Sequence, residues 1–269
     1  MTTQSNKGLA VVTGASAGIG AIYADRLARR GYDLLLVARN GERLQALADR
    51  LAHETGRQVE AFKADLVRKD DLARLEARLR EDARITMLVN NAGIGSVASI
   101  LQADVETMDA MIQLNITALT RLTHAVAPAF VARGTGTIVN ISSVVGVAVE
   151  MLNGVYSASK SYVLSFGHAL QKDLADKGVR VQTVLPGATA TEFWDVAGYA
   201  AQKTSSTTMS AADLVDAALA GLDQGEHVTI PGLQDVGDWT RWEEDRRAMS
   251  AKFNNAKPSA RYGLATNAA

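Results

Sequence analysis

The chain of 269 residues carries 28 Lys and Arg against 29 Asp and Glu, a formal net charge of −1, and it contains no cysteine. Nucleic acids and acidic membrane surfaces are usually bound by a clustered basic excess, so neither is expected as a partner. Without cysteine, disulfides and thiolate metal sites are excluded. Hydrophobic residues make up 47% of the chain and charged residues 21%, which is typical of a folded protein rather than a disordered one.

No targeting or membrane-spanning segment is recognisable. The first ten residues, MTTQSNKGLA, are polar and lack the apolar core of a signal peptide. No run of about eighteen apolar residues is present, so no transmembrane helix is expected. We therefore expect a cytoplasmic protein.

Short apolar runs alternate with longer amphipathic segments along the chain. Most of the runs are rich in Val, Leu and Ile, as in strands that are buried on both faces. This alternation predicts an α/β fold, in which a doubly wound, parallel, seven-stranded sheet has helices on both faces. The expected strands are residues 9–13, 33–37, 58–63, 87–90, 136–141, 179–185 and 227–230.

Two longer and more apolar helices are expected at about residues 104–133 and 155–177. No linker rich in Pro, Gly or Ser divides the chain, so residues 1–269 are expected to form a single Rossmann-type domain. Residues 189–210 are less regular, are expected to be partly helical and are the predicted lid of a substrate site.

The C-terminal tail, residues 232–269, is the other irregular stretch. Its charged part, residues 237–249, is expected to form an amphipathic surface helix with Trp239 and Trp242 on one side.

A glycine-rich turn follows the first expected strand. Residues 13–20 read Thr-Gly-Ala-Ser-Ala-Gly-Ile-Gly, and a helical pattern then runs to Arg30, where Gly31 ends it. The helix N-terminus offers free N–H groups and the positive end of its dipole to a pyrophosphate. Such a turn also joins strands to helices where no ligand binds, but its place at the first strand–helix junction favours a dinucleotide.

The end of the second expected strand predicts which dinucleotide is bound. Folds that select NAD usually carry Asp or Glu there, to bind the ribose hydroxyls. Here Ala38 takes that place and Arg39 follows. A guanidinium binds a 2′-phosphate in fork geometry, so NADP(H) is favoured over NAD(H). The alternative is that Arg39 is only a solvated residue at the start of a helix.

A group of polar residues follows the fifth expected strand. Tyr156 and Lys160 are four residues apart on an expected helix and therefore share a face. A nearby ammonium lowers the pKa of a phenol, which makes Tyr156 a candidate acid toward a developing alkoxide. Ser143 ends the strand and is a candidate donor to the same oxygen. Tyr-x-x-x-Lys alone is a weak signal, which the serine and the glycine-rich turn strengthen.

These motifs together resemble those of the short-chain dehydrogenase/reductase family, in the same order and over nearly the whole chain. The further matching positions are Asp65-Leu66 at the adenine, Asn90-Asn91-Ala92-Gly93 after the fourth strand, Asn115 in the long helix, and Pro186 to Thr191 at the nicotinamide carboxamide. Asn90 itself is expected to hold the sheet together rather than contact the cofactor.

The resemblance implies a role for each residue. Tyr156 exchanges a proton with the substrate oxygen, and Lys160 lowers the pKa of Tyr156 and binds the nicotinamide ribose. Ser143 orients the carbonyl, and Asn115 holds a water that links Lys160 to solvent. No metal is required. The residues expected at the cofactor are Gly14, Ser16, Gly18, Ile19, Gly20, Arg39, Asp65, Leu66, Asn91, Ala92, Gly93, Tyr156, Lys160, Pro186, Gly187, Thr189 and Thr191.

The expected walls of the substrate site are mostly apolar. An anionic substrate would require a basic partner, and none is present in residues 144–152 or 193–194. We therefore expect a neutral, hydrophobic or bulky substrate. The residues assigned to the walls are Ile94, Gly95, Val145, Met151, Leu152, Phe193 and Trp194.

The sequence thus predicts an NADP(H)-dependent oxidoreductase that interconverts a secondary alcohol and a ketone. Two alternatives remain, an isomerase or dehydratase of the same family that uses bound cofactor, and a non-catalytic NADP-binding regulatory protein. The resemblance also implies a homo-oligomer, a tetramer or a dimer. Side chains expected to serve both core and interface are Leu119, Leu122, Val126, Phe130, Val163, Phe166 and Leu170.

Overall fold

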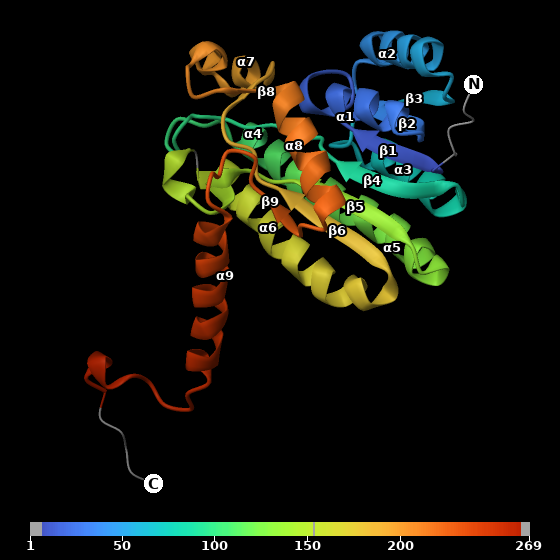
Figure 1. Ribbon diagram of the computed structural model, residues 1–269. Helices are drawn as coiled ribbons and strands as arrows, with labels where there is room; N and C mark the ends of the chain where they lie inside the picture. Colours follow the sequence, from blue (N-terminus) through green and yellow to red (C-terminus); the bar gives the residue numbers. More distant parts are fainter. Residues whose placement is uncertain (1–6, 153, 265–269) are drawn as a thin grey trace. The chain divides into compact units, whose positions relative to one another are not determined.

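The computed structural model describes residues 7–152 and 154–264 (Figure 1). The chain divides into two compact units, the first ending at Gly232 and the second beginning at Leu233. The prediction of a single domain over residues 1–269 extends beyond the described residues at both ends and stays a prediction.

The first unit is built on a parallel seven-stranded sheet with the strand order β3-β2-β1-β4-β5-β6-β9. The predicted α/β fold is confirmed, and two strands match their predicted bounds. β2 is one residue longer than predicted, β4 begins two residues earlier, and β3, β6 and β9 are shorter. The strands are β1 (Leu9–Thr13), β2 (Asp33–Ala38), β3 (Val59–Lys63), β4 (Ile85–Asn90), β5 (Gly136–Ile141), β6 (Val179–Val184) and β9 (Val228–Thr229).

Helices cover both faces of this sheet (Figure 1). Successive residues of β2 alternate between two cores, with Leu34 and Leu36 on one side and Leu35 and Val37 on the other. Burial on both faces explains why inner strands such as β1 and β2 have continuous apolar sequences. One core is closed by α1 (Gly18–Arg29), α2 (Gly41–Thr55) and α8 (Ala211–Gln224), the other by α3 (Lys69–Glu81), α5 (Leu119–Arg133) and α6 (Gly154–Leu174).

The first long helix was predicted to be continuous over about residues 104–133. The structure instead has a π-helical segment within it. α4 (Val105–Ile112) passes into η1 (Gln113–Ala118) and then into α5. A π-helical insertion is rare and is frequently found at functional sites. Asn115 lies within it. The second long helix, α6, begins within one residue of its predicted start, and a 3₁₀ turn, η4 (Ala175–Lys177), continues it.

The side chains expected to serve both core and interface pack inside the protein. Leu119, Leu122, Val126, Phe130, Val163 and Leu170 are buried, and Phe166 packs against the same core. Their predicted role in the core is thus confirmed, and their role in an interface and the predicted homo-oligomer stay predictions. None of the described helices is long and apolar enough to cross a membrane.

The lid segment, residues 189–210, is tied at both ends. β7 (Thr189–Ala190) pairs in parallel with β8 (Met209–Ser210), so a small second sheet closes the base of the segment. Between these strands lie α7 (Phe193–Ala197) and η5 (Ala200–Thr204), which confirms the predicted partly helical character. This pairing holds the two ends of the segment next to each other.

The second unit contains α9 (Val236–Ser250), η6 (Ala251–Phe253) and η7 (Ala260–Tyr262). The predicted helix is present, and Trp239 and Trp242 stack on one side of it, with ring centroids 4.7 Å apart. The carboxylate of Glu243 is buried and accepts hydrogen bonds from Arg246 and Arg247.

Candidate active site

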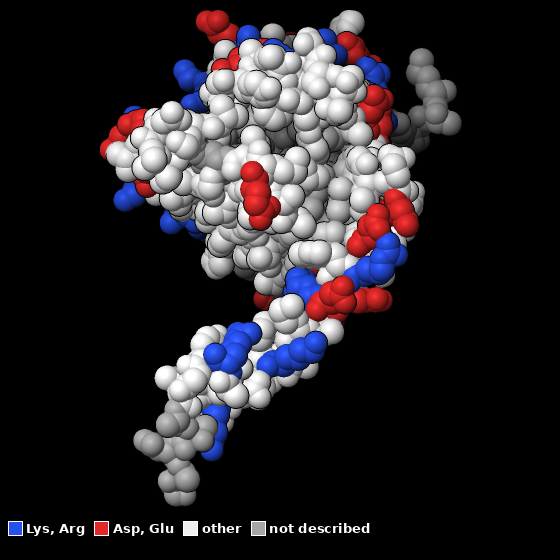
Figure 2. All heavy atoms as spheres, turned by 90° about the vertical axis from the view of Figure 1, so that its left-hand side faces the viewer, with Lys and Arg blue, Asp and Glu red and all other residues white. Residues whose placement is uncertain are grey.

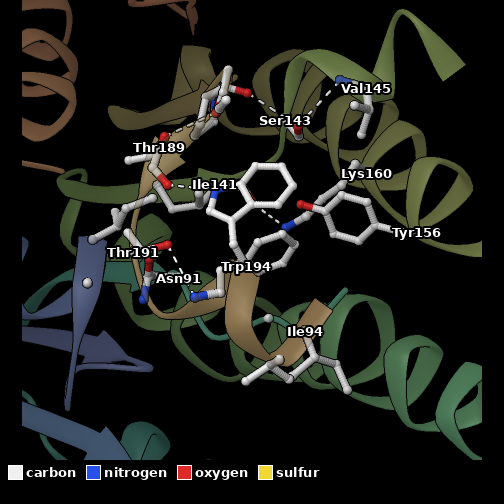
Figure 3. A pocket seen from close by; sticks show the side chains of 18 of the residues that line it. Asn91, Ile94, Ile141, Ser143, Val145, Tyr156, Lys160, Thr189, Thr191 and Trp194 are labelled. Carbon is white, nitrogen blue, oxygen red and sulfur yellow. Dashed lines mark hydrogen bonds between the residues drawn. The ribbon is translucent and has the colours of Figure 1, made fainter. Parts of the chain in front are cut away.

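A cavity of about 620 Å³ lies at the carboxyl ends of β1, β4, β5 and β6, beneath the lid segment (Figure 3). This edge is where open α/β sheets bind ligands, at the point where the strand order reverses. The predicted residues that line it are Gly14, Gly18, Ile19, Arg39, Asn91, Ala92, Gly93, Ile94, Ser143, Val145, Met151, Leu152, Tyr156, Lys160, Pro186, Gly187, Thr189, Thr191, Phe193 and Trp194.

Six predicted site residues do not line this cavity: Ser16, Gly20, Asp65, Leu66, Gly95 and Asn115. The side chain of Leu66 is buried in the core, and the carboxylate of Asp65 accepts a hydrogen bond from the backbone of Val67. The adenine contacts assigned to this pair stay predictions. Gly20, Gly95 and Asn115 instead pack against or position residues around the cavity.

The glycine-rich turn has the geometry of a phosphate-binding loop. Gly14 and Gly18 adopt φ angles of +65° and +53°, which residues with a side chain rarely adopt. Gly20 is required for a different reason. A Cβ atom on Gly20 would lie 2.3 Å from the carbonyl oxygen of Gly14 and 2.5 Å from Nδ2 of Asn91. The turn therefore closes onto the first helix only because Gly20 has no side chain.

Gly20→Ala is expected to lower the free energy of unfolding by about 1–3 kcal/mol, because the added methyl group meets backbone that is held by β1 and β4. Chemical denaturation followed by circular dichroism measures this change. Gly154→Ala is the matched control, since nothing lies within 4 Å of a Cβ atom on Gly154. Equal stability of the two variants would contradict the packing role of Gly20.

The two asparagines after β4 hold the fold together in different ways. The side chain of Asn91 donates to the carbonyl oxygens of Thr13 and Gly14, at 2.9 and 3.2 Å, and so fixes the glycine-rich turn. Asn90 donates to Thr123 and Asn140, at 3.0 and 2.9 Å, between strands and helix. The expectation that Asn90 holds the sheet together is confirmed. Asn91 lines the cavity, but its amide group serves the loop.

Two arginines lie near the end of β2, and they differ in their partners. Arg43 donates to the carboxylate of Glu192 in the lid segment, at 2.8 and 3.1 Å. Arg39 is exposed and lines the cavity, and no described residue forms an ion pair or hydrogen bond with its guanidinium group. Arg39 is therefore the cation that is available to an anionic group at this end of the cavity.

Ser143, Tyr156 and Lys160 are brought together in the cavity (Figure 3). The Ser143 hydroxyl donates to the carbonyl oxygen of Pro186 at 3.2 Å and lies close enough to the phenol of Tyr156 to affect its pKa. The Lys160 Nζ lies 5.7 Å from the centre of the tyrosine ring. Lys160 donates to the carbonyl oxygen of Ile141, the last residue of β5, at 2.9 Å. Ser142 donates to the carbonyl oxygen of Lys160 at 2.7 Å. These bonds join α6 to the end of β5 and fix the positions of both groups.

The sequence predicts a lowered pKa for Tyr156, but in the structure this pKa is raised. Burial disfavours the phenolate and raises the pKa well above its usual range, whereas the nearby Ser143 hydroxyl lowers it by less. Burial likewise lowers the pKa of Lys160 to about 8, because the ammonium is the disfavoured form. Spacing alone reveals the proximity of the two groups but not the depth of their burial. A neutral phenol is the form that can donate a proton to a ketone oxygen.

Lys160 is expected to make the stability of the cofactor-free protein depend on pH. Its pKa is about 8 in the folded chain and 10.5 in the unfolded reference. Between these values the unfolded state binds more protons, so the free energy of unfolding rises with pH. From pH 8 to 9.5 the wild type should gain about 1–2 kcal/mol relative to Lys160→Met. Denaturation midpoints of both proteins at the two pH values measure this, and parallel changes would contradict the burial of the ammonium.

Asn115 lies behind the cavity wall, and its side chain holds that wall in place. Its Nδ2 donates to the carbonyl oxygen of Ile94 and to the hydroxyl of Ser159, at 2.9 and 3.0 Å. Its Oδ1 accepts from the backbone of Ile94 at 3.0 Å. The π-helical segment thereby connects the loop after β4 to α6. The water link assigned to Asn115 stays a prediction.

Several groups at the site were not predicted from the sequence. The carbonyl oxygen of Ile141 and the hydroxyl of Ser159 orient the lysine and the asparagine, and no motif reveals a backbone acceptor. The lid segment adds polar groups to the cavity wall from Glu192, Tyr199, Gln202 and Thr207. Among the described residues, no three His, Asp or Glu side chains gather in a way that could hold a metal ion.

This arrangement is that of a dinucleotide-dependent oxidoreductase, because a phosphate-binding loop and a proton donor open into one cavity. The chain matches the family model described as short chain dehydrogenase over residues 8–200. An uncharacterized oxidoreductase of Staphylococcus saprophyticus is 35% identical over 223 residues, 82% of this chain and 94% of the relative. The chain belongs to the short-chain dehydrogenase/reductase family.

Solved structures extend the similarity over the length of the chain. A short-chain dehydrogenase from Sphingobium yanoikuyae in complex with NADPH has a TM-score of 0.92 and 49% identity, and the match covers 95% of this chain and 100% of that one. A bulky-bulky ketone specific alcohol dehydrogenase from Comamonas testosteroni has a TM-score of 0.89 and 42% identity, with 96% and 99% covered. The predicted family and the predicted Rossmann-type fold are confirmed.

Proposed function

We propose that the protein is an NADP(H)-dependent oxidoreductase that interconverts neutral, apolar ketones and the corresponding secondary alcohols. The observation that carries this proposal is that Ser143 and Tyr156 lie together in the same cavity as the glycine-rich turn and Arg39. A hydroxyl and a neutral phenol side by side are two donors for one carbonyl oxygen.

The cavity fits a dinucleotide. The positive φ angles of Gly14 and Gly18 expose backbone N–H groups at the start of α1, where a pyrophosphate is stabilised. Arg39, at the end of β2, is free to bind a 2′-phosphate. The NADPH in the Sphingobium yanoikuyae structure supports the choice of NADP(H) for this chain.

The chain's own residues supply position and a proton. Ser143 and Tyr156 bind the carbonyl oxygen and polarise it, and the phenol transfers its proton to that oxygen as negative charge develops there. Lys160, fixed by Ile141, lies where its ammonium form stabilises the phenolate that remains. The cofactor, when bound, supplies the hydride that reduces the carbonyl carbon. In alcohol oxidation each transfer is reversed.

The walls of the cavity favour an apolar substrate. Val145, Leu152, Phe193 and Trp194 line it, and Met151 lines it although its side chain is 64% exposed. The face of the first unit that is turned to the viewer in Figure 2 carries few acidic or basic side chains over most of its area. The specificity of the Comamonas testosteroni enzyme for bulky-bulky ketones supports substrates with two bulky substituents for this chain.

A panel of ketones with graded substituents tests the proposal. NADPH consumption and alcohol formation should be greatest for neutral aryl and cycloalkyl ketones and small for keto acids of similar size, because no basic residue in the apolar wall compensates a carboxylate. A preference for keto acids would contradict the assigned substrate class.

A further inference from the structure

The ring of Phe193 lies directly beside the proposed proton donor. Phe193 is the first residue of α7 in the lid segment, and its ring centroid is 5.5 Å from that of Tyr156, with the planes inclined by 43°. On its other side it meets Trp194 edge-on at 5.3 Å. Trp194 is buried, and its indole N–H donates to the carbonyl oxygen of Thr189 at 2.8 Å. The ring is therefore supported by residues that are themselves fixed.

Gly95 provides the surface on which this ring rests. A Cβ atom on Gly95 would lie 2.4 Å from Cζ of Phe193, 2.8 Å from its Cε2 and 3.1 Å from Cδ2 of Tyr156. The φ angle of Gly95 is not positive, so the backbone conformation does not require glycine. What does require glycine is the close approach of the aromatic ring to the main chain.

We propose that Phe193 sets the upper size of the ketone that the cavity accepts, and that Gly95 is the seat that holds its ring beside Tyr156. This proposal rests on the proposed function and specifies the substrate class of that site. The carbonyl oxygen must reach Tyr156 and Ser143, so one substituent of the ketone must lie next to the tyrosine ring. The Phe193 ring occupies part of that space.

The size of the effect follows from the packing of apolar substrates. A difference of a single methylene group in an apolar pocket changes selectivity by roughly 10–200-fold. Removal of the phenyl ring should therefore raise the ratio of kcat/KM for cyclohexyl phenyl ketone to that for acetophenone at least about tenfold. Phe193→Leu should give an intermediate ratio, because leucine retains part of the volume.

The first experiment measures this ratio for the wild type, Phe193→Leu and Phe193→Ala with NADPH. Phe253→Ala is the matched control, because it makes the same truncation at a side chain that is 71% exposed and does not line the cavity. The dissociation constant of NADPH, measured by nicotinamide fluorescence, should stay within about twofold in all variants. A ratio in Phe193→Ala that equals that of the wild type, or that rises equally in Phe253→Ala, would overturn the proposal.

The second experiment tests the seat through a double-mutant cycle. Gly95→Ala should lower kcat/KM for acetophenone at least about tenfold in the wild type, because the methyl group displaces the ring against Tyr156. In the Phe193→Ala background the same change should have less than about a twofold effect. Equal losses in both backgrounds would show that Gly95 acts independently of the ring and would overturn its assignment as the seat.

A third measurement separates this inference from the proposed function. Binding of the same two ketones to the protein saturated with NADP⁺ can be followed by calorimetry, with no turnover. Phe193→Ala should raise the affinity for the larger ketone relative to the smaller one at least about tenfold. If no ketone is reduced but this shift is seen, the proposed reaction is wrong and the role of Phe193 stands. If ketones are reduced but the relative affinity is unchanged, the proposed reaction stands and the role of Phe193 is wrong.

Discussion

Replacement of Tyr156 by Phe is expected to lower the turnover of a ketone with NADPH by at least about a hundredfold, the usual scale of general acid catalysis. The substitution removes one hydroxyl group and keeps the ring that packs against Phe193. The expected loss is therefore in kcat, with the dissociation constant of NADPH nearly unchanged. Steady-state kinetics and nicotinamide fluorescence measure the two quantities.

Tyr162→Phe is the matched control for this prediction. Tyr162 lies on the same helix, its hydroxyl pairs with that of Thr120 at 2.8 Å, and it does not line the cavity. Its loss should leave turnover within about threefold, as is usual for a hydrogen bond distant from the chemistry. Retention of most of the turnover by Tyr156→Phe would refute the assigned proton donor.

Replacement of Arg39 by Ala is expected to lower the preference for NADPH over NADH by roughly ten- to hundredfold. A 2′-phosphate carries nearly two negative charges, and Arg39 is an exposed cation at the cavity with which no described residue forms an ion pair or hydrogen bond. The site is open to solvent, so high salt should reduce the effect and favour its lower end. The measurement is the ratio of kcat/KM for the two cofactors.

The Arg43–Glu192 pair provides the comparison for this prediction. Because Arg43 is already paired, the double change Arg43→Ala with Glu192→Gln removes a cation and an anion together. It should alter the cofactor ratio less than Arg39→Ala does. A larger change from the double variant, or a wild-type preference for NADH, would contradict the assignment of Arg39.

The fold was predictable where one physical pattern determines the structure. Strands buried on both faces must be apolar throughout, so the cores of the inner strands were visible in the sequence. The glycine-rich turn was likewise visible, since few residues adopt the conformation of Gly14 and Gly18. The π-helical segment around Asn115 was not, because the helical pattern of apolar residues continues through it.

At the site, the residues were predictable and their interactions were not. The spacing of Ser143, Tyr156 and Lys160 indicated a shared cavity, but the direction of the pKa of Tyr156 depends on burial, which spacing does not encode. The ion pair of Arg43 and Glu192 joins residues that are 149 positions apart, and no local signal connects them. Gly95 was placed on the substrate wall by its position alone, and its contact with Phe193 appears only in three dimensions.

The most direct test of the proposed reaction is hydride transfer from deuterated NADPH to a ketone. With NADPH carrying deuterium at both positions of C4 of the nicotinamide, and cyclohexyl phenyl ketone, the protein should form the secondary alcohol with one deuterium at the carbinol carbon for each NADPH consumed. Mass spectrometry of the product and the absorbance of NADPH give both numbers. A product that lacks the label, or an isomerised or dehydrated product formed without net consumption of NADPH, would contradict the proposed function.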